Sequence, residues 1–191
     1  MPPRSPQEMM AAVAANLQQR TGRSLSEWVE LVNASGIDPL DQKAVRNWLK
    51  TQHGVPQNSQ WEIADTAACA AGWVRPSVEG YIDSQYTGPK AHLRPLFDRL
   101  REIIEALGDD VRAEGRSTYT PFVRRRQFAA VAAASRARLE VGLRYSNPPT
   151  SPRLSPAKAP GQATHKLSVS SLEEIDEEVA ALLRESYEQN G

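Results

Sequence analysis

The second half of the chain carries most of the side chains that could hold an anion. Residues 110–170 contain eleven arginines and lysines against three acidic residues, whereas residues 172–188 contain seven acidic residues and one arginine. Guanidinium groups bind phosphate and carboxylate through charge-assisted hydrogen bonds. Two interpretations stay open: an anion-binding surface, or a basic sheet that the acidic segment partly neutralises through ion pairs within the chain.

Three consecutive arginines, Arg124 to Arg126, stand between two stretches that are typical of β-strands. The alternation that begins in residues 119–123 resumes at Gln127, so we expect the arginines to span a tight turn or a bulge. One or two of them would then face solvent whatever the function is. They indicate a site only if Arg124 or Arg126 lies close to functional residues that are distant in the sequence.

Tyr119 and His165 are the candidate catalytic residues. Tyr119 lies just before the arginines, and nearby positive charge would lower the pKa of its phenol and help it to bind or protonate an oxyanion. His165 opens the last predicted strand after a proline-rich loop, a position that often carries functional side chains. Each also has a structural explanation, Tyr119 as a packing residue on a half-buried sheet and His165 as a surface or capping residue.

Other kinds of site are not indicated. The three histidines lie far apart, no His or Cys spacing is typical of metal ligands, and no glycine-rich phosphate loop occurs, so we expect no metal and no cofactor. The single cysteine, Cys69, excludes an internal disulfide and is expected to be a small packed residue. Residues 44–64 have a helix–turn–helix outline, but the second helix lacks the basic residues of a DNA-recognition helix.

The chain of 191 residues has 23 basic and 23 acidic side chains, so its formal net charge is zero. Attraction to nucleic acid or to a membrane surface would therefore have to come from local charge asymmetry. No stretch approaches the roughly 18 apolar residues of a membrane span, and the first residues do not resemble a signal peptide. We expect a cytoplasmic protein without membrane contact, and the sequence does not indicate its oligomeric state.

Residues 1–72 are predicted to form a small helical bundle. Capping boxes at residues 5–8 and 24–27 mark two helix starts, and two further helices follow before Gly72. Apolar residues recur at helical spacing along these segments. Three tryptophans are expected on the inward faces: Trp28, Trp48 and Trp61.

Residues 73–90 contain two prolines and two glycines and are predicted to be a linker, with a helical turn at residues 77–83, to a second domain over residues 91–191. A helix over about residues 95–107 is followed by three alternating stretches, a proline-rich loop over residues 146–164, a last strand and the acidic helix. The predicted fold class is α+β, with an N-terminal helical bundle followed by an antiparallel sheet with helices packed on it.

Both predicted domains resemble those of a group of bacterial two-domain proteins of unknown function. The N-terminal resemblance rests on TGRSLSEWVELVNASG and NWLKTQHGV, and the C-terminal one on STYTPFVRRRQFAAV, RLEVGL and HKLSVSSLEEIDEEVAALLRESY. Together they cover roughly residues 9–187. The C-terminal domain type also occurs attached to restriction-like nuclease domains, which implies, by association, a link to nucleic acid. Residues 57–76 depart from the glycine- and alanine-rich helix usual in this group.

The resemblance implies a set of ligand-binding residues at the polar positions of the family's motifs: Arg116, Tyr119, Arg124, Arg126, Arg153 and His165. One hypothesis is a binding protein for an anionic ligand, possibly nucleic acid, that uses the basic sheet surface. The alternative is an enzyme that acts on a small molecule, possibly in biosynthesis, in a pocket between the two domains, with Tyr119 or His165 as acid or base and an arginine holding the anion. A third hypothesis is an adaptor that binds a partner protein through the acidic helix.

Overall fold

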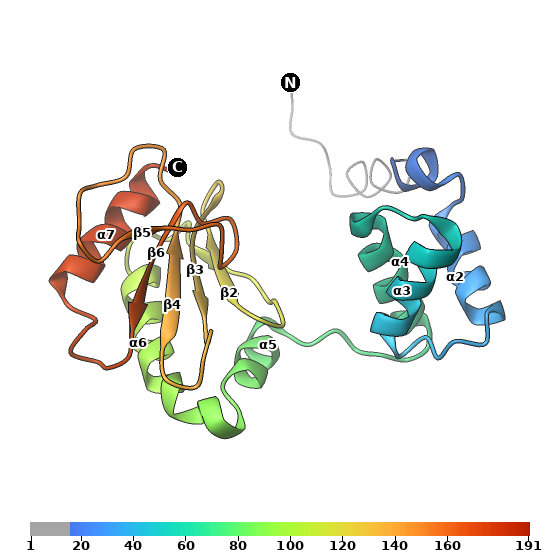
Figure 1. The fold of residues 1–191 in the computed structure, drawn as a ribbon, viewed down its shortest axis with the longest axis horizontal. Helices are drawn as coiled ribbons and strands as arrows, with labels where there is room; N and C mark the ends of the chain where they lie inside the picture. The colour runs from blue at the N-terminus through green and yellow to red at the C-terminus, as the bar shows by residue number, and fades with distance from the viewer. Residues whose placement is uncertain (1–15) are drawn as a thin grey trace. The chain divides into compact units, whose positions relative to one another are not determined.

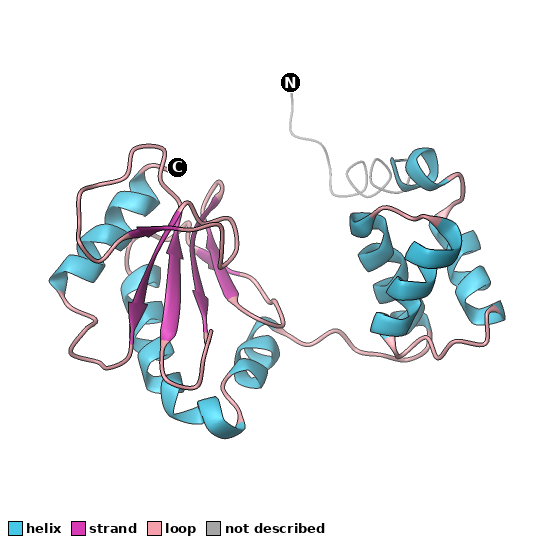
Figure 2. Cartoon of the chain, viewed as in Figure 1, coloured by secondary structure: helices cyan, strands magenta, loops and turns pink. Residues whose placement is uncertain are grey.

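The computed structural model of the protein describes residues 16–191. The chain divides into two compact units, one that ends at Arg75 and one that runs from Pro76 to Gly191 (Figure 1). The first is made of helices and the second contains both helices and a sheet (Figure 2). The helix start expected at residues 5–8 lies outside the described residues.

The first unit is a set of helices, as predicted. After a helix that ends at Thr21, three more follow: α2 (Leu25–Ala34), α3 (Gln42–His53) and α4 (Gln57–Ala70). The capping box before α2 is formed: the Ser24 hydroxyl accepts a hydrogen bond from the Glu27 N–H, and the Glu27 carboxylate accepts one from the Ser24 N–H at 2.7 Å. The apolar faces of these helices share one core: Leu17, Trp28, Val32, Val45, Leu49, Val55, Ile63, Ala64 and Ala67.

The three tryptophans expected inside this bundle take different positions. Trp28 is buried and Trp48 is half-buried. The prediction is wrong for Trp61, whose side chain is 50% exposed, because α4 turns a different face toward the core. The guanidinium of Arg46 lies 3.7 Å from the Trp61 ring centre, within the range of a cation–π contact. Cys69, expected to be packed, is also exposed.

The segment expected to be a linker is largely helical. Helix α5 (Val78–Gln85) and the 3-10 helix η1 (Gly88–Leu93) occupy most of residues 73–90. Three side chains in or next to these two helices belong to the core of the second unit: Ile82, Tyr86 and Leu93. Burial of this apolar surface makes the segment part of the domain, so the extended connection is shorter than its composition suggested.

The second unit is built on a six-stranded antiparallel sheet with the strand order β1-β2-β3-β4-β6-β5. Its strands are β1 (Arg112–Ala113), β2 (Thr120–Val123), β3 (Gln127–Ala132), β4 (Leu139–Leu143), β5 (Ser155–Pro156) and β6 (His165–Val169). Helices α6 (Arg94–Glu105) and α7 (Glu177–Glu188) cover one face of the sheet (Figure 1), and Phe97, Phe122 and Phe128 are fully buried in the core. The α+β fold class is confirmed.

The other face of the sheet is partly covered by the proline-rich loop. A Cβ atom at Gly142, in the middle of β4, would lie 2.7 Å from the carbonyl oxygen of Pro160. Gly161 in the same loop has a φ of 64° and rests against the amide of Gln127 at the start of β3. Because these positions lack side chains, the loop can approach the strands closely and fix the end of the sheet where β3 begins.

Helix α7 is tied to the sheet by buried hydrogen bonds. The hydroxyl of Ser186 donates to the Phe128 carbonyl oxygen at 2.6 Å and accepts from the Arg144 N–H at 3.1 Å. The phenol of Tyr145 donates to the Leu182 carbonyl oxygen at 2.9 Å, and burial raises the pKa of Tyr145, so this donor stays protonated. These bonds hold the start of β3 and the end of β4 against α7.

Replacing Ser186 with alanine should lower the free energy of unfolding by about 0.5–1.5 kcal/mol, because it removes the buried hydrogen bond from the Ser186 hydroxyl to the Phe128 carbonyl oxygen, while that carbonyl still accepts from the Arg144 N–H. Urea unfolding followed by circular dichroism would measure the change. Ser168→Ala on β6 is the matched control, since Ser168 is exposed, and it should leave stability close to that of the parent. Equal stability of the two variants would contradict the role given to Ser186.

Candidate functional site

The three arginines form the turn between β2 and β3. The register of the two strands shifts between Phe122 and Val123, and the N–H of Arg124 donates to the Arg126 carbonyl oxygen at 3.0 Å. The predicted turn or bulge is therefore observed. Arg125 and Arg126 are exposed, whereas Arg124 is half-buried.

Arg124 is held by groups of the chain itself. Its Nε donates to Asp110 Oδ2 at 2.6 Å, and its guanidinium carbon lies 4.1 Å from the ring centre of Tyr187 in α7. The Tyr187 hydroxyl donates to Asp110 Oδ1 at 2.7 Å. The Arg124 guanidinium and then the Tyr187 hydroxyl hold the pKa of the Asp110 carboxyl below its ordinary value. This closed arrangement anchors the turn to α7 and offsets the charge of Arg124.

Arg116 and Arg153 are also paired within the chain. Arg116 lies 2.8 Å from the Glu114 carboxylate, in the segment between β1 and β2. Arg153 contacts both carboxylate oxygens of Asp176 at 2.8 Å and donates to the Glu174 carbonyl oxygen at 2.6 Å. Asp176 is the N-cap of α7, so Arg153 fastens the proline-rich loop to the start of that helix.

Tyr119 and His165 lie apart from each other and from the arginine turn. Tyr119 is half-buried at the end of β2 that is opposite to the turn. His165 in β6 is aligned, through one residue each of β4 and β3, with Phe122 in β2. Three strand spacings, or about 14 Å, therefore separate His165 from β2. Its Nδ1 lies 3.1 Å from Thr164 Oγ1. The six candidate residues are thus distributed over the sheet rather than gathered at one point, and a ligand-binding role for them stays a prediction.

Of the basic residues that lack acidic partners, sequence reasoning singled out Arg126 as a ligand-binding residue and missed most of the others. Arg112 pairs in register with Val123 beside the turn, and the N–H of Arg144 donates to the Phe128 carbonyl oxygen at 3.0 Å near the start of β3. In the part of the chain that the structure describes, five basic side chains of this region form no ion pair. We call them the basic end of the sheet: Arg112, Arg125, Arg126, Arg144 and Lys158.

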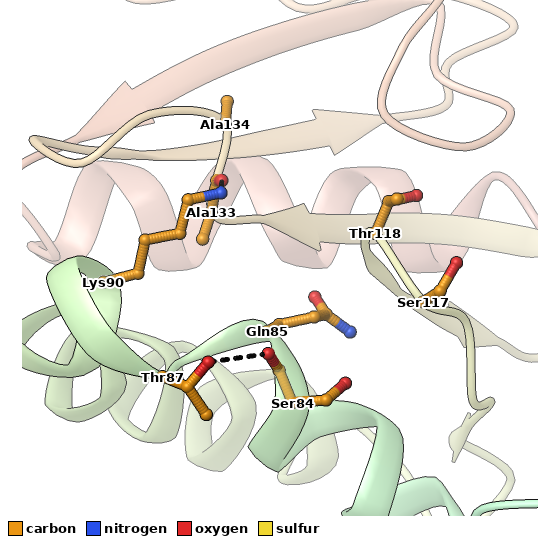
Figure 3. A pocket seen from close by; sticks show the side chains of 8 residues that line it. All are labelled: Ser84, Gln85, Thr87, Lys90, Ser117, Thr118, Ala133 and Ala134. Carbon is orange, nitrogen blue, oxygen red and sulfur yellow. Dashed lines mark hydrogen bonds between the residues drawn. The ribbon is translucent and has the colours of Figure 1, made fainter.

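A pocket of about 410 Å³ lies at the opposite end of the sheet (Figure 3). It is lined by α5, η1, the segment before β2 and the residues that follow β3: Ser84, Gln85, Thr87, Lys90, Ser117, Thr118, Ala133 and Ala134. None of the six candidate residues lines it. The pocket escaped sequence reasoning because one wall belongs to the segment that was expected to be a linker.

The described residues contain neither a group of side chains arranged for a metal ion nor a helix suited to span a membrane. Among residues 16–191, no group of three His, Cys, Asp or Glu side chains is arranged to hold a metal ion. Over the same residues, no helix combines the length and the apolar character needed to cross a bilayer.

The family of the chain follows from its second unit. Residues 82–190, more than half of the chain, match a family model described as a domain of unknown function (DUF5655). The chain belongs to the DUF5655 family. Residues 9–58 match a second domain of unknown function (DUF4287), so the resemblance to two-domain proteins of unknown function is confirmed. No curated protein and no solved structure matches the chain.

Both features described above belong to the DUF5655 domain. Every residue of the basic end and every residue that lines the pocket falls within residues 82–190. They occupy opposite ends of its sheet, because the β2–β3 turn and the end of β3 are separated by the length of β3. The DUF5655 domain therefore carries two chemically distinct surfaces.

The Asp110 cluster predicts how stability responds to acid. Its carboxyl has a lower pKa in the folded than in the unfolded protein, so the stability it contributes is present above its ordinary pKa of 3.8 and is lost as the pH falls through the folded value. Asp110→Asn should reduce stability at neutral pH and flatten its decline in acid. Urea unfolding over a pH series tests this, and Asp109→Asn, which removes the same charge beside the cluster, should keep the parent's pH dependence.

Proposed function

We propose that the DUF5655 domain binds the phosphate backbone of a nucleic acid through the basic end of its sheet. One observation carries the proposal: five basic side chains from four segments lie at this end without an acidic partner in the described chain. Arg124 supports them, because its bonds to Asp110 and Tyr187 fix the turn that presents Arg125 and Arg126.

A polymeric anion fits this surface better than a small one. Arg112, Arg125, Arg126 and Lys158 are exposed, and only Arg144 is half-buried, with its guanidinium on the side chain of Gln162. Exposed cations on different strands and loops can each meet a separate phosphate along a chain. Each such contact releases counterions, so binding is expected to weaken steeply as salt is added.

In this proposal, the arginines that pair with carboxylates support the binding surface and do not contact the phosphates directly: Arg116, Arg124 and Arg153. Their guanidinium groups are engaged with acidic side chains of the same unit, so a phosphate would have to compete with those partners. Among the four arginines of the expected set, Arg126 is the one that forms no ion pair in the described chain and is available for direct contact. The resemblance implies that this domain type also occurs with restriction-like nuclease domains, which supports the same class of ligand.

Two pairs of exposed arginines allow a matched test. The full chain is titrated with labelled single-stranded and double-stranded oligonucleotides over a salt series, with Arg125→Ala/Arg126→Ala against Arg136→Ala/Arg138→Ala. Arg136 and Arg138 are exposed in the β3–β4 turn at the other end of the sheet. Removing two phosphate contacts should reduce the slope of log K against log salt by about 1.4 for single strands and about 1.8 for duplex.

The proposal predicts this loss for the first pair alone, with the second pair binding like the parent. It is abandoned if the parent binds neither oligonucleotide at low ionic strength. It is equally abandoned if the two double variants lose the same affinity, since that result would indicate diffuse attraction without a defined surface.

A further inference from the structure

The pocket at the end of β3 is lined almost entirely by polar side chains. Six of its eight lining residues carry a hydroxyl, amide or ammonium group, and no Asp or Glu is among them. Its volume of about 410 Å³ is within the range of roughly 300–1,000 Å³ typical of small-molecule sites. Figure 3 shows these side chains around one hollow, with Lys90 on one wall and Ser117 and Thr118 on another.

Lys90 brings an uncompensated positive charge to this pocket. The residue is half-buried in η1, and its Nζ donates to the carbonyl oxygen of Ala133, just beyond β3, at 2.5 Å. An ammonium has three N–H donors, so this bond leaves two of them for other partners. Within residues 16–191, no carboxylate lies at ion-pair distance from Lys90.

The hydroxyls of the pocket divide into donors and acceptors. Ser84 donates to the Tyr81 carbonyl oxygen at 2.7 Å and Thr87 donates to the Ser84 carbonyl oxygen at 3.3 Å, so these two hydroxyls have lone pairs to offer. In the described chain, Ser117 and Thr118 make no side-chain hydrogen bond and can donate to an anion. Donors for an oxyanion therefore come from two walls of the pocket.

Gln85 adds an acceptor that has no partner. Its Nε2 donates to the Arg116 carbonyl oxygen at 2.9 Å and lies 3.4 Å from Thr120 Oγ1, which fixes the orientation of the amide. Its Oε1 is buried and makes no hydrogen bond among the described residues, and the side chain lines the pocket (Figure 3). A buried amide oxygen without a donor is uncommon in folded proteins and is satisfied when a ligand brings one.

We infer that this pocket binds a small molecule that carries an oxyanion, phosphate or carboxylate, together with a hydroxyl or N–H donor. Lys90, Ser117 and Thr118 hold the oxyanion, and the donor of the ligand meets Gln85. Hydroxy acids and sugar phosphates have this combination of groups. The pocket is at the opposite end of the sheet from the basic end, so this inference does not depend on nucleic-acid binding.

Three probes separate the two recognition elements: inorganic phosphate, glycerol 3-phosphate and glycerol. They are titrated into the full chain while backbone amide signals are followed by NMR. Glycerol 3-phosphate should shift the amides of the lining residues and bind more tightly than inorganic phosphate, whereas glycerol should bind too weakly to saturate. Glycolate serves as the carboxylate counterpart and distinguishes a phosphate site from a carboxylate site.

Lys90→Gln should weaken glycerol 3-phosphate binding by about tenfold or more, because it removes a charged hydrogen-bond donor. Lys90→Arg should bind more tightly than Lys90→Gln, since it restores the charge. Thr118→Val removes one hydroxyl donor, keeps the shape of an exposed side chain and leaves Lys90 in place. It should also weaken glycerol 3-phosphate binding. If Lys90→Gln does not fold, the affinity of Thr118→Val tests the inference.

Two controls keep this test apart from the nucleic-acid proposal. Arg125→Ala/Arg126→Ala should bind glycerol 3-phosphate like the parent, and Lys90→Gln should bind oligonucleotides like the parent. The inference is overturned if none of the anionic probes shifts the lining amides, if the shifts centre on the β2–β3 turn, or if Lys90→Gln and Thr118→Val both keep the parent's affinity.

Discussion

The hydrogen bonds between Ser186 and the sheet hold the DUF5655 domain in its working arrangement. A single hydroxyl near the C-terminal end of α7 contacts the Phe128 carbonyl oxygen in β3 and the Arg144 N–H directly after the neighbouring strand β4. Since one side chain serves both strands, α7 cannot slide without breaking both contacts at once. The turn that carries Arg125 and Arg126 and the end of β4 that carries Arg144 thereby take fixed places relative to each other.

A second consequence concerns which cations stay available. Arg124 and Arg153 look equivalent to Arg125 and Arg126 in the sequence, but α7 presents Tyr187 to Arg124 and Asp176 to Arg153, and both become structural. Ion pairs of this kind contribute little each when exposed. Their effect here is to decide which arginines stay available to a ligand. Arg124 and Arg153 contact α7 or its N-cap, whereas Arg125 and Arg126 remain exposed to solvent.

The fold was largely predictable from the sequence because its signals are local. The capping box at Ser24 and Glu27, the change of periodicity after α6 and the turn at Arg124 to Arg126 depend on residues a few positions apart. The site was not predictable in the same way. Whether an arginine has a partner depends on residues as far apart as Arg124 and Tyr187, and the pocket depends on Gln85 in α5, which donates to the Arg116 carbonyl oxygen in the segment before β2. Composition also misjudged residues 73–90, because the burial of Ile82 and Tyr86 outweighed two glycines and two prolines.

The aromatic residues are divided between the two units in a way that has a practical use. All four tryptophans lie at or before Trp73, in the first unit, and all five tyrosines lie at or after Tyr81, in the second. Indole emission excited at the red edge of the absorption band therefore reports on the helical unit alone. The melting of the helical unit can be followed by fluorescence in the intact chain, without labels or dissection.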